Sequence, residues 1–171
     1  MPAGRFLGAR EGHRYVDLMR WLRDDDAPTT SLEELLDLRP DLSELYQDLF
    51  QRLWTATGFD PVLLELCRVR QAQLLGCDAE AVRRTPLAVD AGLDEALVGS
   101  LPSWPTSPAF SPAAKACLAY TEAFVIDPHG VDDQHADVVR EETGEAGLVA
   151  LTMALGLFDG LCRLRLSLED A

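Results

Sequence analysis

The apolar positions of the chain recur three or four residues apart over most of its length. In segment 42–57, for example, leucines stand at positions 42, 45, 49 and 53, which is the spacing of one helix face. Alternating apolar and polar runs long enough for a β-strand are missing from the sequence. The pattern therefore predicts an all-α fold.

Residues that favour helix ends divide this pattern into successive helices. Three sites place an N-cap residue before a proline: Asp60-Pro61, Thr85-Pro86 and Ser111-Pro112. Asp41 is expected to cap the helix that follows it, and Gly76 to end the helix that begins at 61. The expected helices cover 13–24, 31–38, 42–57, 61–75, 85–91, 94–101, 111–125, 132–142 and 145–168. The last helix is apolar on almost all sides, so we expect it at the centre of the domain.

The length of 171 residues suits one compact domain. The acidic stretch "RDDDAP" at 23–28 is typical of a linker, so we expect an N-terminal extension with one helix at 1–30 and a helical domain at 31–171. The longest apolar run is interrupted by Asp159, and the first residues lack an apolar core segment. No transmembrane helix and no signal peptide are therefore predicted, and a cytoplasmic location is expected.

The net charge of −14 narrows the choice of partners. A protein that binds nucleic acid needs a cationic surface to replace counterions at the phosphates, and an acidic chain repels both phosphates and anionic membranes. Neither nucleic acid nor membrane is an expected partner. An acidic, solvated surface is the simplest interpretation of the charge.

The four cysteines are Cys67, Cys77, Cys117 and Cys162. None forms a C-x-x-C pair, and none has a histidine at zinc-ligand spacing. We therefore expect no metal site, and scattered cysteines in a reducing compartment are usually small buried apolar residues.

Glu65, Arg68 and Cys77 form the first group that could carry chemistry. Residues three apart share a helix face, so Glu65 and Arg68 can point together into a cleft. A carboxylate near Cys77 could accept its proton and raise its thiolate content. The alternative is an ordinary Glu–Arg surface pair and a buried cysteine.

Two further candidates lie toward the C-terminus. Asp159 and Arg163 are four apart in an apolar stretch, so they form either a salt bridge inside the helical core or a polar floor of a pocket. His129, in "IDPHG", could act as an acid or base near neutral pH, or bond to backbone within its turn.

Three segments together resemble a known family: "ELCRVRQAQLLGC", the stretch from "AVDAGLDEALVGSLPSWPTSPAF" to "AYTEAFVIDPHGVDD", and "GLVALTMALGLFDGLCRLRLSL". Over about residues 35–168 their order is similar to that in the carboxymuconolactone decarboxylase and alkylhydroperoxidase D-like (AhpD-like) family. The resemblance implies an AhpD-like multi-helix bundle that assembles into homo-oligomers, commonly trimers or hexamers. Peroxidase members use a C-x-x-C pair, a following histidine and an upstream glutamate. Decarboxylase members act on a lactone acid without a metal or organic cofactor, so no cofactor is expected.

The family motif is only partly present. The glutamate position corresponds to Glu65 and the first cysteine to Cys77, but Glu80 stands at the second cysteine and Arg84 at the histidine. A disulfide cannot form between Cys77 and Glu80, so the two-thiol reaction of the redox members is missing at this motif.

Three functions remain open. In the first, the chain binds a small organic molecule, with acid/base chemistry of lyase or isomerase type by Glu65 and with Arg68 or Arg84 holding a substrate carboxylate. In the second, it is a one-cysteine peroxidase that acts on a hydroperoxide at Cys77 and is resolved by an external thiol or by Cys67. In the third, it is a non-catalytic oligomeric scaffold. Solvent access to Cys77, and an enclosed pocket at Glu65, distinguish these possibilities.

Overall fold

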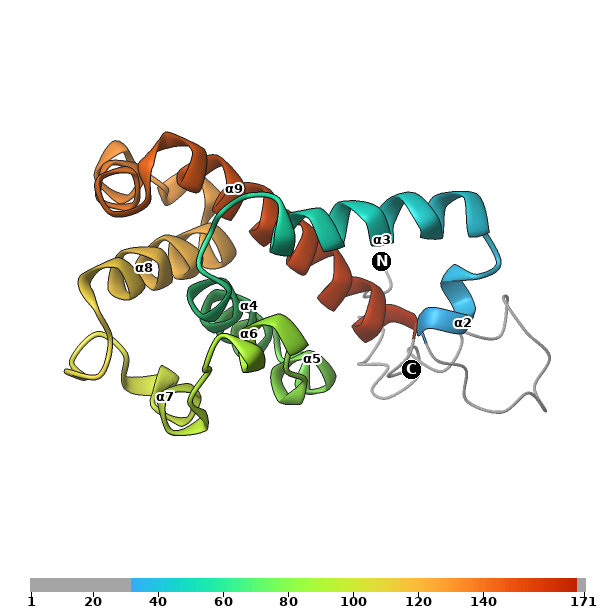
Figure 1. The fold of residues 1–171 in the computed structure, drawn as a ribbon, viewed down its shortest axis with the longest axis horizontal. Coiled ribbons are helices and arrows are strands. Elements are labelled where there is room, and N and C mark those ends of the chain that lie inside the picture. The colour runs from blue at the N-terminus through green and yellow to red at the C-terminus, as the bar shows by residue number, and fades with distance from the viewer. Residues whose placement is uncertain (1–31, 169–171) are drawn as a thin grey trace, which may run out of the picture.

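The computed structural model describes residues 32–168, and every regular element within that range is a helix (Figure 1). The elements are α2 (Leu32–Leu36), α3 (Pro40–Thr55), α4 (Pro61–Leu75), α5 (Asp78–Val82), α6 (Pro86–Asp90), α7 (Glu95–Gly99), η1 (Leu101–Ser103), α8 (Pro112–Ile126), η2 (Pro128–Gly130) and α9 (Asp133–Leu168). The all-α prediction is confirmed for this range. The predicted helix 13–24 and the extension 1–30 lie outside the described residues.

Two of the three predicted N-caps before proline bond as expected, whereas Thr85 precedes α6 without a side-chain capping bond. Asp60 Oδ1 accepts a hydrogen bond from the Val62 N–H at 2.9 Å, and Ser111 Oγ accepts one from the Ala114 N–H at 3.1 Å. Gly76 ends α4 with a φ of 69°, a left-handed conformation that favours glycine. Local sequence therefore fixes both ends of α4, the helix that carries the motif glutamate.

The start of helix α3 and the presence of helix α5 differ from the prediction. Helix α3 begins at Pro40, so Asp41 is not its cap but lies in the first turn, where it pairs with Arg39. Proline has the φ value of a helix and lacks only an N–H that would be unpaired there, so it can start the helix itself. The five-residue helix α5 was not predicted, because it is too short to show an apolar period.

Helix α9 is two helical segments joined at Gly144, whose φ of 77° and ψ of 171° are not helical. The break falls between the two predicted helices, 132–142 and 145–168. Among the described residues, the segment Asp133–Ser167 is the one long and apolar enough to cross a membrane by length and composition. Leu151, Leu155 and Phe158 of this segment are buried in the core, which accounts for its apolar character.

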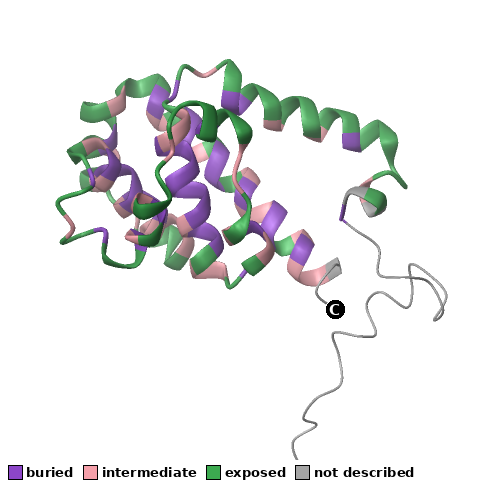
Figure 2. Ribbon diagram, turned by 60° about the horizontal axis from the view of Figure 1, so that its bottom comes forward, coloured by how far each residue is buried: buried purple, intermediate pink, exposed green. Residues whose placement is uncertain are grey.

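Helix α4, and not α9, occupies the centre of the bundle. It packs against both α8 and α9, and its buried residues lie on all of its sides. Helix α9 packs against α2, α3, α4 and α8, but it keeps an exposed face that includes Val149 and Met153, so it is less enclosed than its apolar sequence predicted. Figure 2 shows the buried positions concentrated in the body of the bundle and few along α3. Because α4 is buried on all sides, its charged residues Glu65 and Arg68 lie in the interior.

Candidate functional site

Glu65 and Arg68 lie on one face of α4 and are both buried. Arg68 Nε donates to Glu65 Oε2 at 2.9 Å, and Arg68 Nη2 donates to Glu65 Oε1 at 2.7 Å. This is the two-bond geometry in which a guanidinium matches a carboxylate best. The predicted pairing of the two residues is confirmed, but inside the protein and not in an open cleft.

Arg68 uses all of its donors within the protein. Besides the two bonds to Glu65, Nη1 donates to the Glu80 carbonyl at 2.9 Å and to Glu80 Oε2 at 2.8 Å. Nη2 also donates to the Arg83 carbonyl at 2.7 Å. A guanidinium has five N–H groups, and these contacts occupy each of them. Arg68 therefore has no donor left for a substrate carboxylate in this conformation.

Glu80 extends the network to the last helix. Its Oε1 accepts hydrogen bonds from Arg165 Nε and, at 3.2 Å, from Arg83 Nη1. Arg165 is buried as well, so Glu65, Arg68, Glu80 and Arg165 form a continuous set of buried charges that joins α4, α5 and α9. We call these four residues the ion network. Two carboxylates and two guanidinium groups balance, which is the condition under which buried charges are tolerated.

Thr85 completes the surroundings of Glu65. Its N–H donates to Oε1 at 3.0 Å, and its hydroxyl donates to Oε2 at 2.9 Å. Burial alone would raise the pKa of Glu65, but the hydrogen bonds and charge of Arg68, together with those from Thr85, outweigh it and the pKa is lowered. Glu65 is thus held as a fully bonded carboxylate, which is a poor arrangement for a general base.

The cysteines lie in two adjacent pairs. Cys77 is 0% exposed and Cys162 is 2% exposed, and they share a small apolar cluster beside the ion network. Burial, followed by the proximity of Cys77, raises the pKa of Cys162 to about 12. A hydrogen bond with Cys67, together with burial, raises the pKa of Cys117. Cys77 therefore has Cys162 as its neighbouring thiol, whereas Cys67, the internal partner considered from the sequence, lies beside Cys117.

Tyr46 of α3 reaches the same region. Its hydroxyl is buried and has no hydrogen-bond partner among the described residues. Burial raises the pKa of Tyr46 to about 12, and the nearby Glu80 and Cys162 add to the rise. A polar atom without a partner thus lies near the thiols and the ion network.

Of the other candidates from the sequence, Arg84 reaches the edge of this region, because its Nη1 donates to the Arg83 carbonyl at 2.7 Å, to which Arg68 also donates. Within the described part of the chain, His129, Asp159 and Arg163 make no hydrogen bond to the ion network. Arg84 pairs with Glu95, with Nε to Oε1 at 2.8 Å. His129 is exposed in η2, with its N–H bonded to Asp127. Asp159 and Arg163 form a pair at 2.6 Å whose arginine is largely exposed, so the expectation of a charge pair inside the core was wrong.

Several residues of this region were not selected from the sequence as site residues: Glu80, Thr85, Arg165, Cys162 and Tyr46. The usable signal was the position of Glu80 in the family motif and the presence of a charged Arg165 on an apolar helix. Cys162 and Tyr46 carry no local signal, since only the tertiary fold brings them to Cys77 and Glu80.

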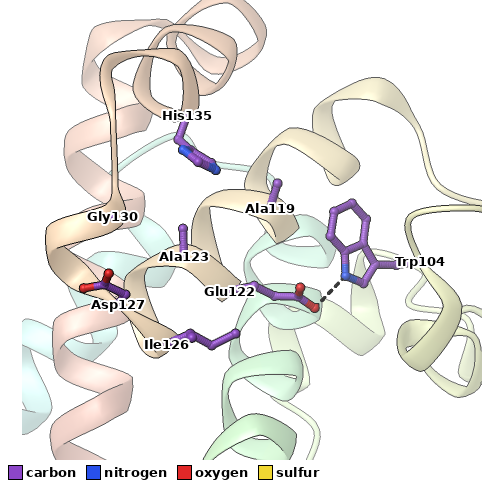
Figure 3. A pocket seen from close by; sticks show the side chains of 8 residues that line it. All are labelled: Trp104, Ala119, Glu122, Ala123, Ile126, Asp127, Gly130 and His135. Atoms are coloured by element: carbon purple, nitrogen blue, oxygen red, sulfur yellow. Dashed lines mark hydrogen bonds between the residues drawn. The ribbon is translucent and has the colours of Figure 1, made fainter.

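A separate groove of about 330 Å³ lies over α8 and the start of α9 (Figure 3). The residues that line it are Trp104, Ala119, Glu122, Ala123, Ile126, Asp127, Gly130 and His135. One wall is apolar and formed by α8, and the polar groups stand around it. The groove thus combines apolar contact with acidic groups.

Glu122 is held at one oxygen only. Trp104 Nε1 and Arg70 Nε each donate to Glu122 Oε1 at 2.7 Å. Oε2 accepts no hydrogen bond from the residues that the structure describes. At another part of the groove, His135 Nδ1 lies 2.7 Å from Asp132 Oδ1, so the proton is on Nδ1 when the ring is neutral and Nε2 is then an acceptor.

Comparison with known proteins agrees with this fold. The sequence model of the carboxymuconolactone decarboxylase family matches residues 40–123. A crystal structure of a protein of unknown function from Agrobacterium tumefaciens, named as a candidate antioxidant defence protein AhpD, superposes with a TM-score of 0.64. It is 17% identical, and the match covers 80% of this chain and 94% of that chain. Among curated proteins, none matches the sequence.

Residues 40–123 include α4, α5 and the motif segment with Glu65 and Cys77. The structural match extends the similarity over most of the chain. Segment 40–123 therefore belongs to the carboxymuconolactone decarboxylase family, and the chain has a fold similar to that of the AhpD candidate.

Proposed function

We propose that this protein binds a small organic amine in the groove over α8, and that the ion network at the family's motif position is structural. The observation that carries the proposal is Glu122, whose Oε1 is fixed by Trp104 and by a salt bridge to Arg70 at 2.6 Å, and whose Oε2 accepts no hydrogen bond from the described residues. A carboxylate held in place by two donors can bind an ammonium group without first ordering its own side chain.

The remaining lining residues suit the same ligand. Ala119, Ala123 and Ile126 offer an apolar wall for a short hydrocarbon body. Trp104 adds an indole to the lining, and a cation over such a ring face is attracted by its quadrupole. Asp127 supplies a second acidic group. An apolar body with a primary amine matches both features.

The lining of the groove supports a cation in place of the organic acid considered from the sequence, because it includes Glu122 and Asp127 and no arginine or lysine. Arg68 has no free donor, Arg84 is paired with Glu95, and Arg163 is paired with Asp159. The carboxylates of the groove would repel an anion, and the net charge of −14 adds to that repulsion. A small cation therefore fits the described charges better than a small carboxylate.

Calorimetric titration with 2-phenylethylamine, 2-phenylethanol and 3-phenylpropanoate tests this proposal. These probes share an aromatic body and differ in charge. We expect the amine to bind at least tenfold more tightly than the alcohol, and the acid not to bind. Equal affinities for the three probes, or no binding of the amine, would refute the proposal.

Two variants place the binding in the groove. Ile126 is 71% exposed, so Ile126→Lys adds a positive charge at the groove without disturbing the core, and we expect it to weaken amine binding at least tenfold. Glu122→Gln should have a similar effect, whereas Glu44→Gln on the exposed surface of α3 should have none. If the Ile126 and Glu122 variants bind the amine as the wild type does, the ligand lies elsewhere.

A homo-oligomeric state is a second proposal, supported by α3. Leu42, Leu45 and Leu49 lie on one helix face, and all three are exposed in the single chain. Such a stripe is typical of a protein interface. Assembly of copies as a trimer or hexamer stays a prediction, as do the cytoplasmic location, the absence of nucleic-acid and membrane partners, and the absence of a cofactor.

A further inference from the structure

We propose that Cys77 and Cys162 form a dithiol pair that a hydroperoxide oxidises to a disulfide, which links the α4–α5 turn to α9. The two residues are 85 positions apart in the sequence, yet they share one buried cluster with Ala72. Leu75, Ala81 and Leu166 pack around that cluster. The fold thus supplies a second thiol to Cys77 from a helix that the family's C-x-x-C pattern does not involve.

The backbone holds Cys77 in a fixed position. Gly76 turns the chain with a φ of 69°, and the Cys77 N–H donates to the Ala72 carbonyl at 2.9 Å. Cys162 lies on a regular stretch of α9 between the buried Phe158 and Arg165. Both thiols therefore come from regular backbone, and a disulfide further requires that their Cβ atoms come within about 3.5–4.5 Å of each other.

The surroundings contain the groups that a thiol oxidation can use. Arg68 and Glu80 lie close enough to influence the ionisation of Cys162. The Tyr46 hydroxyl, which has no partner among the described residues, is a free donor in the same region. We assign the first attack to Cys77 because it lies at the end of α4, beside the short helix α5, whereas Cys162 lies within the long helix α9 and is then the second, resolving thiol.

The reaction balances in two steps. The Cys77 thiolate attacks the terminal oxygen of the hydroperoxide, the O–O bond breaks, and an alcohol leaves with the proton that Cys77 lost, so that Cys77 becomes a sulfenic acid. The Cys162 sulfur then attacks the Cys77 sulfur, the S–O bond breaks, and water leaves with the proton of Cys162. The two thiols lose two electrons in total, and the hydroperoxide gains them. A dithiol reductant restores the pair.

Burial limits the rate of this reaction. Neither sulfur is reachable in the described conformation, so oxidation requires a local opening at the α4–α5 turn. That opening must break the bonds of Glu80 to Arg68 and Arg165. Oxidation should therefore be slow and stoichiometric, in contrast to the rapid turnover of a peroxidase. Its result is a reversible covalent link between the α4–α5 turn and α9. The pair shares no residue with the groove over α8, so the inference does not depend on amine binding.

The chain contains its own control. Cys67 and Cys117 are also buried and adjacent, but they lie in the main core between α4 and α8. Their helices are long and pack tightly along their lengths, so local opening there needs much more of the fold to unfold. We expect no disulfide at this second pair under conditions that oxidise the first.

Peptide mapping of the full-length protein after treatment with hydrogen peroxide tests the inference. The expected result is a loss of two mass units per chain and a linked peptide that contains Cys77 and Cys162, reversed by dithiothreitol. A disulfide between Cys67 and Cys117, an intermolecular disulfide, or unchanged thiols after prolonged exposure would each overturn it.

Two variants identify the order of attack. In Cys162→Ser we expect a sulfenic acid at Cys77 that dimedone labels and that persists, because the resolving thiol is gone. In the double variant Cys77→Ser/Cys162→Ser we expect at least tenfold less dimedone labelling than in Cys162→Ser alone, because the sulfenic acid forms at Cys77. Thermal unfolding of both variants shows whether they are folded, and the mapping of the wild type decides the question even if they are not. Labelling of Cys162 first would refute the assigned order.

Discussion

Arg68 and Glu65 form a two-bond ion pair in which neither side chain is more than 4% exposed. A buried pair of this kind carries a large desolvation cost, and it is tolerated because Thr85 and Glu80 satisfy the remaining bonds. Glu65 of this pair is the residue that the sequence resemblance aligned with the glutamate of the family motif. In this chain that position is therefore bonded into the fold and is not open to a ligand.

Removing one member of the ion network should lower the stability strongly, because each of its buried charges has a partner of opposite charge. Glu65→Ala leaves part of the Arg68 charge buried without a partner, and we expect the free energy of unfolding to fall by about 3 kcal/mol. Asp159→Ala removes a partly exposed carboxylate from its pair with Arg163, and such pairs contribute about 0–1 kcal/mol. Urea unfolding of the two variants and the wild type measures both changes. Similar small losses in the two variants would mean that the network is not a structural requirement.

The lowered pKa of Glu65 also predicts the direction of an acid effect. A carboxyl group whose pKa is lower in the folded protein than its ordinary value of 4.5 contributes stability above that value and loses it as the pH falls through the folded pKa. We expect the stability difference between the wild type and Glu65→Gln to be largest above pH 5 and to shrink below pH 4. Urea unfolding of both proteins at several pH values measures this difference. A difference that does not change with pH would show that ionised Glu65 is not the stabilising form.

Local sequence predicted much of the bundle because helix ends depend on nearby residues. Asp60, Gly76 and Ser111 act at their own positions, and the Glu65–Arg68 contact follows from a spacing of three residues on a helix. The break at Gly144 lies between the two helices predicted at 132–142 and 145–168.

Local sequence could not predict which arginine of α9 faces the interior. Arg163 and Arg165 are two residues apart, so they lie on nearly opposite sides of the helix. Only the packing of α9 against α4 decides that Arg165 reaches Glu80 while Arg163 stays at the surface. The contact of Cys162 with the cluster of Cys77 depends on the same rotation of the helix.

The partnerless hydroxyl of Tyr46 predicts an unusual response to substitution. Removing a buried polar atom that has no hydrogen bond removes a desolvation cost, so Tyr46→Phe should leave stability unchanged or raise it by up to about 1 kcal/mol. Tyr120 is the matched control, because its hydroxyl lies 2.9 Å from Thr152 Oγ1 and Tyr120→Phe should cost about 1 kcal/mol. Thermal and urea unfolding compare the two. A loss of stability in Tyr46→Phe as large as that in Tyr120→Phe would mean that Tyr46 has a partner in solution.

The exposed leucines of α3 predict how the protein assembles. Leu45 is 69% exposed in the single chain, and a charged residue there should prevent copies from burying this helix face. We expect the wild type to be an oligomer by light scattering coupled to size-exclusion chromatography, and Leu45→Glu to be a folded monomer. Val82→Glu is the control, since Val82 is 74% exposed on α5, away from the leucine stripe, and its replacement should leave the oligomer intact. A monomeric wild type, or an oligomer that survives Leu45→Glu, would show that the α3 face does not join copies of the chain.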